Sequence, residues 1–114
     1  MDDCIFCKIV KGEIPSRKVY EDECTLAFED IAPQAKVHIL VIPKRHYANI
    51  LDISRRGMQD LAAMMHAVEQ VVAAKGLEEN GFRVVTNCGS DGCQSVKHVH
   101  MHVLGGEQLS EKMS

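Results

Sequence analysis

The stretch that decides the fold is His98-Val99-His100-Met101-His102-Val103-Leu104-Gly105-Gly106, near the end of the 114-residue sequence. Three of the six histidines alternate here with apolar residues. Side chains of a β-strand alternate between its faces, so we predict a strand over residues 98–104 with all three imidazoles on one face. Packing alone explains such a row poorly, because each buried imidazole needs a hydrogen-bond partner. The row predicts acid–base, nucleophilic or metal-binding chemistry.

Length and composition limit the classes of protein that fit. The 114 residues, 46% of them apolar, suffice for one domain, 1–114, with one core. The net charge of −3 and the lack of a basic stripe argue against a nucleic-acid partner. We expect no membrane span and no export signal, since no apolar run is long enough. Five cysteines without an export signal then favour reduced thiols in the cytoplasm.

The remaining segments predict an α+β fold. Short strands joined by tight turns favour a five-stranded antiparallel sheet, with one long helix and a short N-terminal helix beside it. The predicted strands are 18–21, 25–29, 37–42, 82–87 and 98–104. We expect the short helix within residues 4–10 and the long one over 54–75, with Ser54 as its N-cap. Five apolar residues form its expected buried stripe: Met58, Leu61, Met65, Val68 and Val72.

The loop Asn87–Ser95 leads directly into the histidine segment. Its two glycines allow several backbone N–H groups to converge on an anion, and Ser95 adds a hydroxyl. Beside a row of imidazoles, we expect that anion to be a phosphate whose phosphorus an imidazole attacks. His38, on the strand 37–42, would orient a triad imidazole if the two strands are neighbours; a core role is the alternative.

The pair Cys4-Ile5-Phe6-Cys7 has the spacing of a metal-binding Cys-x-x-Cys motif. Together with two remote histidines it could complete a tetrahedral zinc site. The alternative is two ordinary buried thiols, and the spacing alone leaves both open.

The histidine segment and its preceding loop resemble the histidine triad (HIT) superfamily, specifically the Hint branch of nucleoside phosphoramidate hydrolases. The resemblance covers nearly the whole chain and implies a HIT-like fold. Other segments match in order and spacing: Ile5–Ile9, Gly12–Pro15, Ala27–Ala35 and His38–Lys44.

This resemblance implies a role for each site residue. His100 would be the nucleophile that forms a nucleotidyl-histidine intermediate, and the carbonyl of His98 would hold its other ring nitrogen. His102 would contact the α-phosphate and the departing group, Ser95 would bind phosphate or leaving group, and His38 would support the triad. The implied nucleotide-binding residues are Phe6, Ile9, Asp30, Ile31, Asn87, Cys93, Gln94, Ser95, Val96, His100 and His102.

Two features of the chain bear on that comparison. Cys93 stands where the family usually has glycine, so its β-carbon could narrow the phosphate loop and slow turnover. Zinc-containing relatives use four positions that correspond here to Cys4, Cys7, His46 and His98. The resemblance therefore allows a structural zinc, and we expect no cofactor to be required for catalysis.

We predict a hydrolase that cleaves the P–N bond of purine nucleoside 5′-phosphoramidates such as AMP-lysine, giving AMP and an amine. The alternatives are a dinucleoside polyphosphate hydrolase of the same superfamily and a nucleotide-binding adaptor with little turnover. The resemblance also implies a homodimer.

Overall fold

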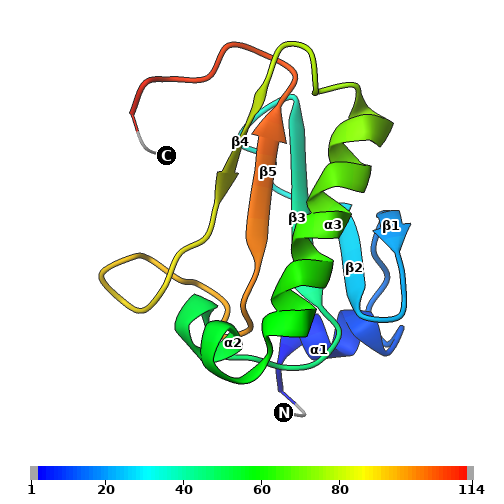
Figure 1. Ribbon diagram of the computed structural model, residues 1–114, viewed down its shortest axis with the longest axis vertical. Helices are drawn as coiled ribbons and strands as arrows, with labels where there is room; N and C mark the ends of the chain where they lie inside the picture. Colours follow the sequence, from blue (N-terminus) through cyan, green and yellow to red (C-terminus); the bar gives the residue numbers. More distant parts are fainter. Residues whose placement is uncertain (1–2, 113–114) are drawn as a thin grey trace.

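The computed structural model describes residues 3–112, in which five strands form one sheet of order β1-β2-β3-β5-β4 (Figure 1). All neighbouring strands are antiparallel, which confirms the predicted α+β fold. The strands are β1 (Lys18–Glu21), β2 (Thr25–Glu29), β3 (Val37–Pro43), β4 (Phe82–Val85) and β5 (Met101–Gly105). The helices are α1 (Ile5–Val10), α2 (Ile50–Arg56) and α3 (Met58–Lys75).

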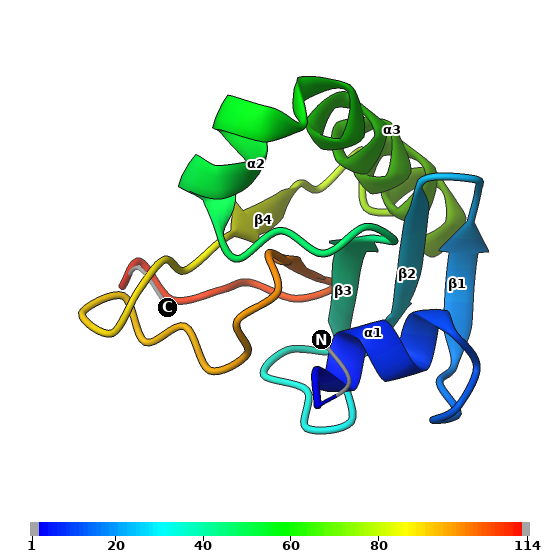
Figure 2. The same cartoon turned by 90° about the horizontal axis from the view of Figure 1, so that it is seen from below.

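Helices cover both faces of the sheet, with α2 and α3 on one side and α1 on the other (Figure 2). Alternate residues of β3 serve the two layers: Ile39 and Val41 join the α3 side, whereas Leu40 and Ile42 join the α1 side. Burial on both faces explains why residues 39–43 of β3 are an uninterrupted apolar run. His38 shares the face of Leu40, so it lies on the α1 side.

The histidine segment is only partly a strand. β5 begins at Met101, so the prediction of a strand from His98 was wrong by three residues. The backbone there pairs with another partner, because the Val99 N–H donates to the Tyr47 carbonyl at 2.7 Å. The predicted alternation still holds, and Val99, Met101 and Val103 are all buried on the α3 side.

The predicted long helix is two helices. Asn49, rather than Ser54, caps α2, and the chain bends at Gly57 before α3 begins. The expected stripe on α3 is also partly wrong, because Met58 and Met65 are exposed. The residues of α3 that do enter the core are Met64, Ala67, Val68, Val71 and Val72. Among the described residues, no helix combines the length and apolarity that crossing a bilayer would need.

Candidate active site

A backbone carbonyl fixes the protonation of His100. Its Nδ1 lies 2.8 Å from the carbonyl oxygen of His98. A carbonyl can only accept, so Nδ1 carries the proton and Nε2 keeps a free lone pair. The Phe6 ring packs against the imidazole in a T-shaped contact, with 5.2 Å between ring centroids. His100 thus offers an oriented neutral nitrogen, as a nucleophile requires.

A second chain of hydrogen bonds sets the proton on His102. The N–H of Gln34 donates to Nδ1 of His38 at 3.0 Å, so neutral His38 carries its proton on Nε2. That Nε2 lies 2.8 Å from Nδ1 of His102 and donates to it. The remaining proton of His102 is therefore on Nε2. His100 and His102, whose ring centroids are 5.0 Å apart, are poised for opposite tasks, one to attack and the other to donate.

The electrostatic environment keeps His38 and His102 neutral. Burial lowers the pKa of His102 to about 4, and the neighbouring His100 and His38 act in the same direction. Burial also lowers the pKa of His38, although the Asp30 carboxylate, 3.4 Å from its Nε2, opposes the shift. At neutral pH both imidazoles are uncharged, as the hydrogen-bond directions require.

A metal ion could also be held by three neighbouring side chains of this site, those of Asp30, His38 and His102. The hydrogen bonds argue for a proton-carrying relay instead. Metal binding through Nε2 of His38 would move its proton to Nδ1, where it would face the N–H of Gln34. That contact would place two donors against each other.

A second cluster, formed by Cys4, Cys7, His46 and His98, fits a tetrahedral metal site. The Sγ of Cys7 lies 3.4 Å from Nδ1 of His46 and 3.6 Å from Nδ1 of His98. Zinc bond lengths imply ligand separations of about 3.5 Å for a sulfur–nitrogen pair. His98 donates from Nε2 to the Pro43 carbonyl at 2.9 Å, which leaves its Nδ1 lone pair facing the thiols.

Burial raises the pKa of the Cys7 thiol to about 11, and a hydrogen bond with Cys4 adds to the effect. A metal at this cluster would have to displace that proton. The cluster joins α1 to the triad segment, since His98 supplies both a ring to the thiols and a carbonyl to His100.

The loop between β4 and β5 closes on itself before the triad. The N–H of Gln94 donates to the Gly89 carbonyl at 3.0 Å. Cys93 has φ 61°, a left-handed conformation that no other non-glycine residue adopts within residues 3–112. A β-carbon on Gly92 would lie 2.6 Å from the Cys88 carbonyl oxygen. The loop therefore needs a glycine at 92 and strains the residue at 93.

The side chain of Gln94 is engaged inside the protein. Its Oε1 accepts from the Gly89 N–H at 3.1 Å, and its Nε2 donates to the carbonyls of Ala48 (2.7 Å) and Val96 (2.9 Å). Both amide protons are used, so this side chain holds the loop and has no proton left for a nucleotide.

The other residues expected to bind nucleotide are spread around the triad. Phe6 contacts the rings of His98 and His100, and Ile9 and Val96 belong to the same apolar cluster under α1. Ile31 is fully exposed, next to Asp30. Ser95 is exposed and Asn87 half-buried on the loop. The structure thus brings Phe6 and Asp30 to the triad and buries Ile9 beside Phe6 in the cluster under α1.

Two backbone partners of the site histidines could not be predicted from residue type. The N–H of Gln34 and the carbonyl of Pro43 set the protons of His38 and His98, yet backbone groups leave no signal in residue type. Thr86, whose hydroxyl donates to the His100 carbonyl at 2.8 Å, could have been suspected from its place next to the loop.

The HIT domain family matches residues 11–109, and the chain belongs to this family. It is 50% identical to a histidine triad protein from Clostridium difficile, with a TM-score of 0.92 and 96% of each chain covered. It is 39% identical to the purine nucleoside phosphoramidase of Escherichia coli K12, over 99% of this chain and 95% of that protein. It is also 48% identical to a 14 kDa zinc-binding protein of Zea mays, over 93% and 84% of the two chains. These relatives support a HIT family hydrolase.

Proposed function

We propose that this protein hydrolyses the P–N bond of purine nucleoside 5′-phosphoramidates, such as AMP-lysine, to a nucleoside monophosphate and an amine. The observation that carries the proposal is the placement of protons in the triad. His100 presents a lone pair on Nε2, and His102 presents a proton on Nε2. Similarity to the Escherichia coli purine nucleoside phosphoramidase supports the choice of bond.

The reaction would proceed in two displacements at phosphorus. First, the nitrogen of the P–N bond takes a proton from water and accepts a hydrogen bond from Nε2 of His102. Nε2 of His100 then bonds to the α-phosphorus while the P–N bond breaks and the neutral amine leaves. The carbonyl of His98 stabilises the positive charge that the attacking ring acquires. Water then displaces His100 from phosphorus and releases one proton to solvent, giving AMP and the restored neutral triad.

Nucleotide binding would draw on the residues around the rings. In this proposal Asp30 binds the ribose hydroxyls, Phe6, Ile9 and Ile31 surround the base, and Val96 lies nearby. Asn87, Ser95 and the backbone of the loop from Cys93 to Val96 would hold ribose and phosphate, and His38 would support His102. Five free cysteines support a reducing, cytoplasmic location.

A structural zinc would be held by Cys4, Cys7, His46 and His98. It would tie α1, and with it Phe6, to the triad segment. None of the proposed chemical steps needs the metal, because His100 supplies the nucleophile and His102 the hydrogen bond to the departing nitrogen.

We further propose that the protein is a homodimer joined along β4. This strand is an edge of the sheet, since β5 is its one partner among residues 3–112. Phe82 and Val84 are 43% and 38% exposed on it. An exposed, apolar edge strand favours pairing with a second chain. Sedimentation at micromolar concentration should give twice the chain mass, and a monomer would contradict the proposal.

The function is tested by comparing turnover of an adenosine 5′-phosphoramidate with that of a diadenosine polyphosphate, with His100→Ala as the control. We expect faster turnover of the phosphoramidate and release of AMP. Preference for the polyphosphate would identify the other hydrolase activity. AMP binding without turnover of either compound would identify a nucleotide-binding adaptor.

A further inference from the structure

Three consecutive residues between β3 and α2 each contact a different part of the candidate site. The His46 ring lies against the His98 ring, with centroids 4.8 Å apart. The Tyr47 carbonyl accepts from the Val99 N–H at 2.7 Å, between two triad histidines. The Ala48 carbonyl accepts from the Gln94 amide at 2.7 Å. We call residues 46–48 the positioning segment. Its three residues in turn contact the cysteine–histidine cluster, the triad and the loop of residues 87–95.

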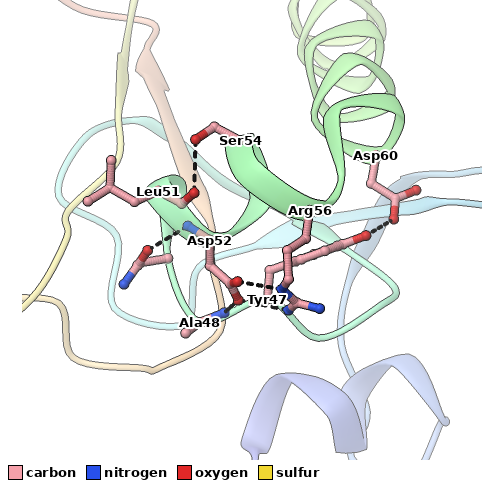
Figure 3. Close-up of polar contacts among 8 residues, drawn as sticks. Tyr47, Ala48, Leu51, Asp52, Ser54, Arg56 and Asp60 are labelled. Atoms are coloured by element: carbon pink, nitrogen blue, oxygen red, sulfur yellow. Dashed lines mark hydrogen bonds and ion pairs between the residues drawn. The ribbon is translucent and has the colours of Figure 1, made fainter.

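The side chain of Tyr47 anchors this segment to α3. Tyr47 and Asp60 are 4% and 8% exposed, and the tyrosine hydroxyl donates to the aspartate Oδ2 at 2.6 Å (Figure 3). This bond raises the pKa of Tyr47, so the hydroxyl stays protonated. A β-carbon on Gly57 would lie 2.4 Å from the hydroxyl oxygen, which explains the glycine between the two helices.

Two residues of α2, Asp52 and Arg56, also hold the positioning segment. The Arg56 guanidinium lies over the Tyr47 ring, 5.1 Å from the centroid, and pairs with the Asp52 carboxylate at 2.6 Å (Figure 3). The same carboxylate accepts from the Ala48 N–H at 2.8 Å. The backbone of residues 46–48 therefore has hydrogen bonds both to the triad and loop and to α2.

We propose that Tyr47 and Gln94 are positioning residues. They act through the segment 46–48 to fix the position of His100 relative to the phosphate loop. The Tyr47 ring belongs to the core on the α3 side, opposite the triad face. The side-chain amide of Gln94 is hydrogen-bonded to backbone groups of residues 48, 89 and 96. An active site displaced by about 1 Å can lose about a hundredfold in rate, so small movements of this segment suffice.

The test uses Tyr47→Phe, Gln94→Met and the double variant. Tyr47→Phe keeps the ring and removes only the bond to Asp60, whereas Gln94→Met keeps length and removes the amide. We expect each single variant to speed hydrogen exchange of the Val99 amide about tenfold. Its kcat/KM for the phosphoramidate should fall about tenfold or more. The double variant should lose less than the product of the two losses, because both act through one segment.

Val71→Ala is the control for lost stability alone. Val71 is fully buried on α3, about three helical turns beyond Asp60. The comparison is made between variants that lose the same free energy of unfolding. We expect Val71→Ala to leave kcat/KM unchanged, and also the exchange of the Val99 amide through local opening. If Gln94→Met does not fold, Gln94→Glu replaces it, since the glutamate keeps the acceptor for Gly89 but cannot donate to Ala48.

Equal effects in Val71→Ala, losses that multiply in the double variant, or unchanged Val99 exchange would each overturn the proposal. The kinetic arm rests on the proposed function, whereas the exchange arm does not. Failure of the proposed function would appear as a wild-type protein without phosphoramidate turnover, and Val99 exchange would still decide whether the positioning residues act as proposed.

Discussion

Replacing Cys93 with glycine should both stabilise the protein and quicken the reaction. Cys93 has φ 61°, where a residue with a β-carbon is disfavoured by roughly 1–2 kcal/mol. Glycine removes this strain but adds freedom to the unfolded chain, which costs about 0.4–1 kcal/mol. We therefore expect Cys93→Gly to raise the free energy of unfolding by about 0.5–1 kcal/mol.

The neighbouring position supplies a contrast of opposite sign. A β-carbon at residue 92 would meet the backbone of Cys88 at 2.6 Å from its oxygen and 3.0 Å from its nitrogen. Backbone atoms cannot rotate aside, so Gly92→Ala should destabilise the protein by about 1–3 kcal/mol. Cys93→Ala keeps the β-carbon and removes only the thiol, so its stability should stay within about 0.5 kcal/mol of wild type.

Urea denaturation, monitored by circular dichroism, measures the free energy of unfolding of all three variants. The comparison requires that they share the same dependence of this free energy on urea concentration. Steady-state kinetics then tests whether relaxing the loop raises kcat/KM for the phosphoramidate in Cys93→Gly. The reasoning would be refuted if Cys93→Gly were less stable than wild type, or if Cys93→Ala were stabilised as much as Cys93→Gly.

Three further predictions concern the triad and the cysteines. His100→Ala should lose several orders of magnitude of turnover while still binding AMP by calorimetry; near-normal turnover would contradict its role. Because burial lowers the pKa of His102 to about 4, the unfolded chain binds a proton there between pH 6.5 and 4 that the folded chain does not. Stability should therefore fall on acidification from pH 7 to 5, and in urea titrations His102→Gln should lose about 1 kcal/mol less. Protein purified without chelator should contain one zinc per chain by elemental analysis, and Cys4→Ser should lower both the zinc content and the melting temperature. Absence of zinc, with Cys4 and Cys7 both open to alkylation in the native state, would refute the metal site.

The sequence was most informative where side-chain periodicity decides the structure. Alternation over residues 98–103 correctly assigned Val99, Met101 and Val103 to the core, because a buried face tolerates no shift in register. The same alternation along residues 37–42 puts His38 on the face of Leu40. The pairing of β3 with β5 then brings the His38 ring to His102.

Prediction failed where tertiary contacts override local patterns. The bend at Gly57 follows from the Tyr47 hydroxyl beside it, a contact between separate elements that residue type does not reveal. On α3, two apolar stripes one residue apart were available, and docking on the sheet selected the one through Met64. The proton positions in the triad depend on backbone groups, such as the N–H of Gln34, whose location only the fold determines.

The contact between Cys4 and His98 closes a span of 94 residues. Closing so long a loop carries an entropic cost that contacts formed earlier must offset, so this contact is expected late in folding. His98 also supplies the carbonyl that orients His100. A chain emerging from the ribosome can thus form the β1–β2 hairpin and α3 long before it has an oriented nucleophile. The reactive imidazole arises only when nearly the whole chain is in place, so partly folded chains would have little capacity to attack nucleotides.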